Sequence, residues 1–174
     1  MAFHGDSAVV LARFCLDSML ESQVRRTVRG MSGKTQNGEE ECTELLQTLI
    51  RNACVNDGTV ESGGEIRSAS VLENFLEGPG LELESYDAAP GRRSLVARIE
   101  GSDPTAPTLL LMGHTDVVPA NSDHWSRDPF GGDLVDGEVW GRGAIDMLNI
   151  TSSMAVAFKR LARSGFTPRG TLVF

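Results

Sequence analysis

Cysteine is scarce in this chain of 174 residues, which contains three: Cys15, Cys42 and Cys54. No two of them form a Cys-x-x-Cys pair, so the sequence indicates neither a zinc knot nor a redox motif. Three thiols are also too few for the disulfide framework of a small secreted protein. The spacing therefore predicts free thiols in a reducing compartment, and we expect the protein to be cytoplasmic.

Long apolar runs and basic clusters are absent as well. No stretch approaches the roughly 20 apolar residues that a membrane-spanning helix needs. The 24 acidic and 16 basic residues give a formal charge of −8, with no basic stripe of the kind that binds nucleic acid. We therefore expect neither nucleic acid nor a membrane as a partner. A phosphate-binding glycine loop, a nucleophile elbow and internal repeats are also missing.

Residues 1–34 differ in composition from the rest of the chain. Their apolar residues precede a basic group at positions 25–29, whereas a secretory signal has its basic residues first. The stretch either forms a short amphipathic helix or is an upstream extension of a chain that naturally begins at Met31. In both cases we expect the folded unit to span residues 35–174.

The remaining sequence alternates between helical and strand patterns, which indicates an α/β fold. Apolar residues at helical spacing predict three helices, over residues 40–53, 65–77 and about 147–161. Alternating apolar residues predict two strands over residues 81–86 and 94–100, and another strand begins near Leu172. Asp136-Gly137 between short apolar pairs predicts a tight hairpin.

Candidate functional residues gather between positions 109 and 149. The apolar run Leu109–Met112 predicts a buried strand, and His114 and Asp116 follow its end. A glycine-rich turn at residues 141–143 then leads to Asp146, where a helical pattern starts. Ends of strands in α/β sheets are the usual places for ligand sites.

These residue types fit a metal site. A neutral imidazole binds zinc well, and it usually donates its other N–H to a carboxylate. In an extended His-x-Asp segment, side chains 114 and 116 point the same way, so Asp116 either supports the His114 ring or binds metal itself. Asp146 is a candidate to bridge two cations. A polar pair without metal is the alternative interpretation of His114 and Asp116.

Three motifs in this stretch occur in a fixed order, namely GHTDVVP, WSRDPF and DGEVWGRGAIDM. Together they resemble the M20 family of zinc metallohydrolases. That family includes carboxypeptidases, dipeptidases, aminoacylases, acetylornithine deacetylase and succinyl-diaminopimelate desuccinylase. The specific resemblance covers residues 108–160, and a looser one reaches back to about residue 40.

The resemblance implies an α/β, aminopeptidase-like three-layer core with a mixed sheet between helices. It implies hydrolysis of peptide or N-acyl amino-acid amide bonds at a site where two zinc ions hold a hydroxide, with Co²⁺ or Mn²⁺ able to replace zinc. By the same resemblance, His114 would bind one zinc, Asp146 would bridge both, and Asp116 would be the catalytic carboxylate that supports His114. The peptide bond after Asp146 would be cis, and a complete member would be a homodimer.

The sequence departs from the family pattern in two places. Leu148-Asn149 stands where Lys-Gly is usual, which puts local helix packing or substrate placement in doubt rather than zinc binding. The family's adjacent glutamates, one of them the general base, would follow the strand near Leu172 and have no counterpart here. We therefore expect residues 35–174 to be the first half of a catalytic domain, without the dimerisation domain. The alternative is a non-catalytic truncated fragment or a weak metal-binding module.

His124 is a second histidine near the candidate site, in a loop. We expect a surface or packing role for it, with a substrate contact as the alternative.

Overall fold

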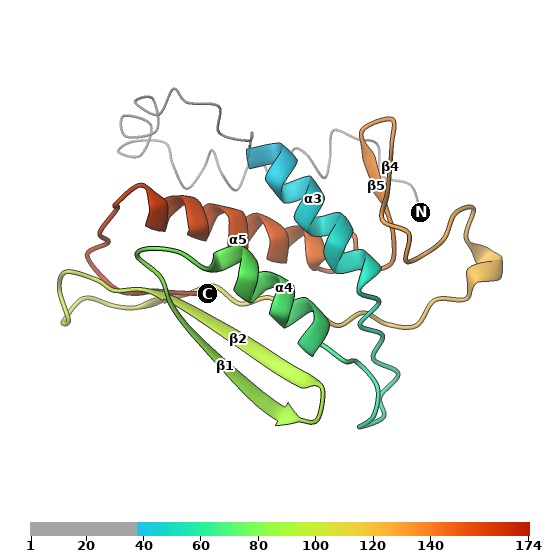
Figure 1. Cartoon of the computed structure of the whole chain (residues 1–174), viewed down its shortest axis with the longest axis horizontal. Coiled ribbons are helices and arrows are strands. Elements are labelled where there is room, and N and C mark those ends of the chain that lie inside the picture. The colour runs from blue at the N-terminus through green and yellow to red at the C-terminus, as the bar shows by residue number, and fades with distance from the viewer. Residues whose placement is uncertain (1–37) are drawn as a thin grey trace.

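The computed structural model describes residues 38–174, so the predictions for residues 1–34 lie outside the described part (Figure 1). The helices are α3 (Gly38–Arg51), α4 (Ile66–Leu76), α5 (Leu148–Arg163) and the short 3₁₀ helix η1 (Ser122–His124). The strands are β1 (Glu82–Ala89), β2 (Arg92–Ile99), β3 (Leu109–Leu110), β4 (Asp133–Val135), β5 (Glu138–Trp140) and β6 (Leu172–Val173).

The three predicted helices are all present, and their ends lie close to the predicted positions. The first turn of α3 carries Glu39, Glu40 and Glu41, and its last turn carries Arg51. This charge order stabilises the helix because acids suit the positive end of the helix dipole and bases suit the negative end. Its apolar face is buried, as the helical spacing predicted.

Strands β1 and β2 form an antiparallel hairpin whose turn contains Gly91 at a φ of +76°. The full sheet has the order β1-β2-β6-β3, with β6 antiparallel to β2 and parallel to β3. The sheet is therefore mixed, as predicted. Because β6 lies between β2 and β3, the last residues of the chain join two strands that come much earlier in the sequence.

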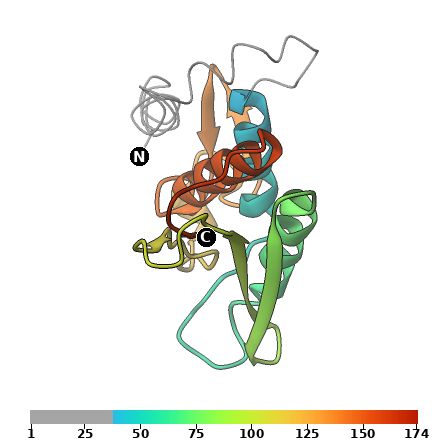
Figure 2. The same cartoon turned by 90° about the vertical axis from the view of Figure 1, so that its left-hand side faces the viewer.

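The described helices lie on one side of the sheet (Figures 1 and 2). Helix α4 packs on β2, and α3 packs on α5. Phe158 of α5 is 1% exposed and lies 6.0 Å from the ring of Phe174, which follows β6. Residues 38–174 place no helix on the opposite face, so they contain two of the three expected layers. Among the same residues, no helix has the length and apolar character needed to cross a bilayer.

The prediction that Leu109–Met112 forms a buried strand is wrong. The strand is limited to Leu109–Leu110, and Leu109, Leu110 and Met112 are 47%, 54% and 74% exposed. The physical reason is that β3 is an edge strand here. It pairs with β6 on one side, and no other described strand lies on its second side. An apolar strand is fully buried only when layers cover both faces of its sheet, and residues 38–174 place no helix on the second face.

Cys42 and Cys54 are buried free thiols, which confirms the prediction for these two residues. Their sulfur atoms lie 3.4 Å and 3.2 Å from the hydroxyl oxygens of Ser153 and Ser68. Burial raises the pKa of the Cys42 thiol, although its hydrogen bond to Ser153 acts in the other direction. Cys15 lies outside the described residues.

Phe158 offers a test of this packing. We expect Phe158→Ala to lower the free energy of unfolding by about 3–5 kcal/mol, because a large buried ring is lost and leaves a cavity. Phe166→Ala is the matched control, since Phe166 is 39% exposed, and it should cost about 0.5 kcal/mol or less. Urea denaturation followed by circular dichroism measures both values. Equal losses for the two variants would contradict the assigned core.

Candidate metal and hydrolase site

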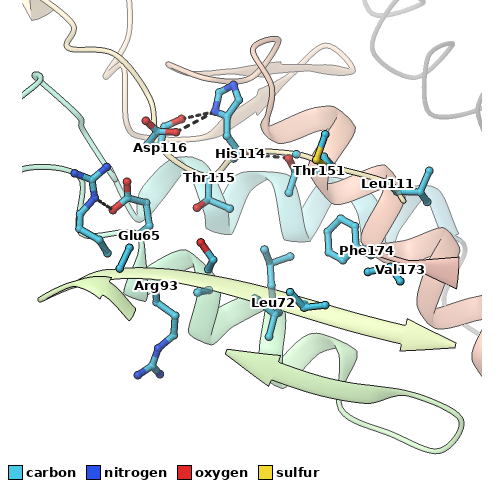
Figure 3. Close-up of a pocket in the computed structure, with 18 of the residues that line it drawn as sticks. Glu65, Leu72, Arg93, Leu111, His114, Thr115, Asp116, Thr151, Val173 and Phe174 are labelled. Carbon is cyan, nitrogen blue, oxygen red and sulfur yellow. Dashed lines mark hydrogen bonds and ion pairs between the residues drawn. The ribbon is translucent and has the colours of Figure 1, made fainter. Parts of the chain in front are cut away.

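The candidate site begins where the chain leaves β3 (Figure 3). His114 and Asp116 lie on this segment, which an isolated parallel bridge between Val55 and Val117 fixes to the loop after α3. The backbone N–H of Val117 donates to the carbonyl of Cys54 at 2.9 Å. The hydroxyl of Thr151 on α5 donates to the carbonyl of His114 at 3.1 Å. The segment is therefore held by two parts of the chain that are distant in sequence.

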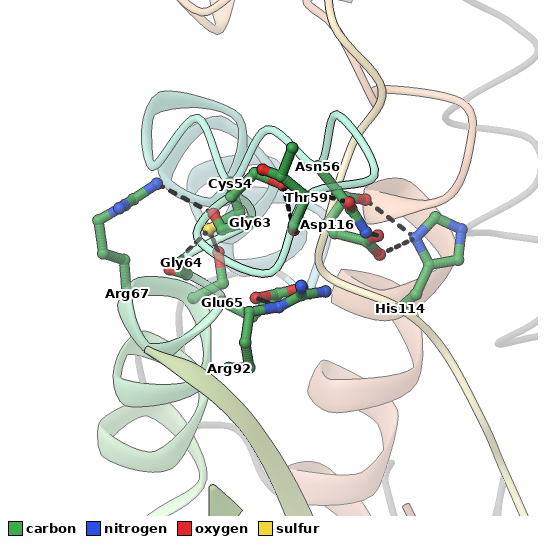
Figure 4. Close-up of polar contacts among 12 residues, drawn as sticks. Cys54, Asn56, Thr59, Gly63, Gly64, Glu65, Arg67, Arg92, His114 and Asp116 are labelled. Carbon is green, nitrogen blue, oxygen red and sulfur yellow. Dashed lines mark hydrogen bonds and ion pairs between the residues drawn. The ribbon is translucent and has the colours of Figure 1, made fainter. Parts of the chain in front are cut away.

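Both ring nitrogens of His114 face oxygen atoms of aspartates, and Figure 4 shows the side of the ring that faces Asp116. Nδ1 lies 3.0 Å from the backbone oxygen of Asp116 and 3.2 Å from its carboxylate Oδ1. Nε2 lies 3.2 Å from Oδ1 of Asp146. The structure thus brings together all three residues that the sequence singled out. Asp116 contacts the Nδ1 side of the ring, on the opposite side from Asp146.

This arrangement favours a cation. A neutral imidazole has one N–H donor and one lone pair, so it can donate a hydrogen bond to only one of these two carboxylates. If Nδ1 donates to Asp116, the lone pair of Nε2 faces the oxygen of Asp146. A second proton on the ring, or a metal ion shared by Nε2 and Asp146, removes that repulsion. The 3.2 Å separation fits the second possibility, because zinc ligands about 2.0–2.2 Å from one ion lie about 3–3.5 Å apart.

The electrostatic environment of His114 leads to the same conclusion. Partial burial lowers the pKa of His114, whereas the hydrogen bonds to Asp116 and Asp146 and the charges of both carboxylates raise it. The raising effects are the larger in sum, so the pKa lies above its usual value. A site that retains a proton more strongly than usual also attracts a metal cation, which competes with that proton.

Asp146 reaches the site through a tight turn. Its approach starts at the β4–β5 hairpin, whose turn residues Asp136 and Gly137 both have positive φ, as the Asp-Gly pair predicted. The chain then passes through Gly143, at a φ of +83°, and the bond from Asp146 to Met147 is cis, which confirms that prediction. The Asp146 side chain is 90% exposed.

The guanidinium of Arg142 lies 5.3 Å from the ring centre of Trp125, next to the turn that carries Asp146.

Two residues of the site were missed from the sequence. Asn56 donates from Nδ2 to Oδ2 of Asp116 at 2.8 Å, and Thr151 holds the His114 carbonyl. The Asn-Asp-Gly stretch at residues 56–58 is typical of a turn that ends a helix, and this local pattern does not predict the contact of Asn56 with Asp116. Thr151 belongs to a helical pattern whose other residues are core, so nothing in the sequence distinguished it.

The site lies between two hollows of the surface. His114 and Asp116 line both of them, with cavity volumes of about 750 Å³ and 830 Å³. Asp146 and His124 line the second hollow, which keeps both interpretations of His124 open. Within residues 38–174, no group of three or more His, Cys, Asp or Glu side chains converges on one point. His114 and Asp146 are thus a pair of candidate ligands rather than a full set.

Comparison with known proteins agrees with the family expected from the motifs. A family model described as peptidase family M20/M25/M40 matches residues 110–174. Succinyl-diaminopimelate desuccinylase of Parvibaculum lavamentivorans is 38% identical over 128 residues, covering 71% of this chain and 30% of that protein. Aminoacylase-1 of Sus scrofa is 34% identical over 137 residues, covering 78% of this chain and 32% of that protein.

Two solved structures share the fold. The dipeptidase Dug1p of Saccharomyces cerevisiae has a TM-score of 0.58 at 21% identity, over 96% of this chain and 34% of that one. Human carnosine dipeptidase 1 has a TM-score of 0.53 at 22% identity, over 98% and 33%. The chain belongs to peptidase family M20/M25/M40, whose members matched here are hydrolases. It spans about a third of the length of the relatives it matches.

Gly143 tests how tightly the turn before Asp146 is packed. Gly143 and Gly137 share a φ of +83°, but a Cβ on Gly143 would lie 2.4 Å from Val117 Cγ1, whereas a Cβ on Gly137 would meet nothing within 4 Å. Gly137→Ala should cost about 1–2 kcal/mol of unfolding free energy from backbone strain alone. Gly143→Ala should cost about 1–3 kcal/mol more, from overpacking against Val117. Equal losses of unfolding free energy for the two variants in chemical denaturation would show that the Val117 side chain moves aside at no cost.

Proposed function

We propose that these residues belong to a metal-dependent hydrolase that cleaves the amide bond of N-acyl amino acids or short peptides at a two-zinc site. The observation that carries this proposal is the His114 ring with an aspartate oxygen at each nitrogen. A bound metal ion can polarise a scissile carbonyl, and a cation at Nε2 of His114 would lie at the wall of a surface hollow.

Each of the three residues has a distinct role in this proposal. His114 would bind one zinc through Nε2, and Asp146 would bridge that zinc and a second one with its two oxygens. Asp116 would receive the Nδ1–H of His114 and so hold the ring in the orientation and tautomer that present the Nε2 lone pair. When bound, the zinc ions would polarise the substrate carbonyl and lower the pKa of a water molecule.

The donor types support zinc as the metal. Imidazole and carboxylate ligands suit zinc, and they also accept Co²⁺ or Mn²⁺. We propose that the other ligands and the general base come from outside residues 38–174, because no group of three candidate ligands converges within them. A homodimeric parent protein remains a prediction from the family resemblance, and a cytoplasmic location remains a prediction from the free thiols.

The substrate class follows from the names of the relatives. Both a desuccinylase and an aminoacylase remove an acyl group from an amino group of an amino acid. We propose a substrate of the same chemistry, with an amide next to a carboxylate-bearing carbon.

A second candidate function is favoured by the same pair of ligands. The 174-residue chain by itself would bind a metal ion through His114 and Asp146 without turning over substrate. Two protein ligands leave positions around a zinc ion for water, but a general base is still needed to activate that water.

Metal binding by the purified chain tests the proposal first. We expect Zn²⁺ to bind and to raise the unfolding temperature, because it binds the folded form in preference to the unfolded one. His114→Ala should abolish this shift, whereas His124→Ala should retain it. Competition with a chromogenic chelator gives the dissociation constants. A zinc-dependent shift that survives His114→Ala would contradict the assignment of the site.

Hydrolysis distinguishes the two candidate functions. N-succinyl and N-acetyl amino acids and a dipeptide are incubated with the zinc-loaded chain, with and without a chelator, and release of the free amine is measured. Turnover that the chelator and His114→Ala both abolish would support the hydrolase in this chain. Zinc binding without turnover would support the metal-binding function for residues 1–174 alone.

A further inference from the structure

We propose that Asn56 is a positioning residue that fixes the carboxylate of Asp116 and, through it, the orientation of the His114 ring. This inference rests on the proposed function, because it concerns the affinity of the metal site at His114. Asn56 lies about sixty positions before Asp116 in the sequence, on the loop that follows α3. It is not a metal ligand in this proposal, and it acts only through Asp116.

The carboxylate of Asp116 is held at both of its oxygens. Asn56 Nδ2 donates to Oδ2 at 2.8 Å, while Oδ1 lies 3.2 Å from Nδ1 of His114 (Figure 4). Because one oxygen contacts Asn56 and the other contacts His114, rotation of the carboxylate would break both interactions. Asn56 therefore selects the carboxylate orientation that keeps Oδ1 beside Nδ1 of His114, whose hydrogen bond goes to the backbone oxygen of Asp116 at 3.0 Å, and that leaves Nε2 directed at Asp146.

The amide of Asn56 is itself held in the orientation that presents its donor. Its Oδ1 accepts hydrogen bonds from the backbone N–H of Gly58 at 3.0 Å and from the hydroxyl of Ser62 at 3.4 Å. Its backbone N–H donates to the carbonyl of Val117 at 2.8 Å, next to Asp116. Because the N–H of Gly58 can only donate and the ionised Asp116 carboxylate can only accept, the opposite amide orientation would place NH₂ against an N–H donor and Oδ1 against a carboxylate oxygen. The NH₂ group must therefore face Asp116.

A neutral donor suits this position. The nearby guanidinium of Arg92 has its Nε 2.6 Å from a Glu65 carboxylate oxygen, so its charge is largely compensated by Glu65 (Figure 4). Asn56 supplies a directed hydrogen bond to Asp116 without adding a positive charge that would repel a cation at His114. Outer partners of this kind orient the ligand and raise its affinity for metal.

Two substitutions at Asn56 separate its donor from its acceptor. Asn56→Asp keeps an oxygen for Gly58 and Ser62 but replaces the NH₂ donor with a second carboxylate against Asp116. Asn56→Ala removes donor and acceptor and adds no charge. The control is Asp57→Ala. It removes the hydrogen bonds that Asp57 Oδ1 accepts from the backbone N–H of Thr59 at 2.9 Å and from the Thr59 hydroxyl at 2.7 Å, and it changes no contact of Asp116.

The experiment measures the zinc dissociation constant of the full 174-residue chain by chelator competition, together with the unfolding midpoint of each zinc-free variant. We expect both Asn56 variants to bind zinc about 10- to 100-fold more weakly than the unsubstituted chain. Asp57→Ala should stay within about twofold of the unsubstituted chain, although it lowers the midpoint, since the metal site does not depend on that turn.

The outcomes are distinct. Weaker zinc binding in both Asn56 variants, with Asp57→Ala unaffected, supports the positioning role. Unchanged affinity in Asn56→Ala, or an equal loss in Asp57→Ala, overturns it and leaves the proposed function intact. If one Asn56 variant fails to fold, its zinc-free unfolding midpoint shows this, and the zinc affinity of the other variant then tests the positioning role. Absence of His114-dependent zinc binding in the unsubstituted chain overturns the positioning role and the proposed function together.

Discussion

An imidazole that faces an aspartate oxygen at each of its nitrogens favours a positive charge in or beside its ring. At His114 the segment that carries the ring is held at three places. The bridge at Val55 and Val117, the hydroxyl of Thr151 and the amide of Asn56 all fix the segment that carries His114 and Asp116. Asp146 alone arrives on an exposed turn, and its contact to the ring is the one that a bound cation would replace.

The strand order determines how these groups meet. His114 follows β3 directly, whereas Asn56 comes from the loop after α3 and Asp146 from the turn before α5. Helix α3 ends five residues before Asn56, α5 begins two residues after Asp146, and the buried faces of α3, α4 and α5 share one core. The geometry of the polar cluster therefore depends on packing that lies well away from it. The buried ring of Phe158 and the exposed pair His114 and Asp146 therefore belong to one structural unit.

Much of this structure could be predicted from the sequence, and the failures have physical reasons. The helices and the β4–β5 hairpin follow from local periodicity and from the positive φ that Asp136-Gly137 accepts. The grouping of His114, Asp116 and Asp146 follows from their motifs. The exposure of Leu109 to Met112 could not be predicted, because the same apolar run suits a central strand and an edge strand. The role of Asn56 could not be predicted for a related reason. It depends on a contact between residues about sixty positions apart, and local sequence patterns carry no information on such contacts.

The position of β6 has a consequence for how the chain folds. Helix α4 and the β1–β2 hairpin pack on each other and are close in sequence, so they can form early, whereas α3 packs chiefly on α5. Within residues 38–174, strand β3 reaches the sheet only through β6, which lies at residues 172–173, between β2 and β3. The entropic cost of closing the long stretch of chain between β3 and β6 must be met before the pairing stabilises the sheet. Such pairings therefore form slowly. On a ribosome, the pairing of β3 and the surface around His114 would therefore take shape only after residues 172–173 have been synthesised.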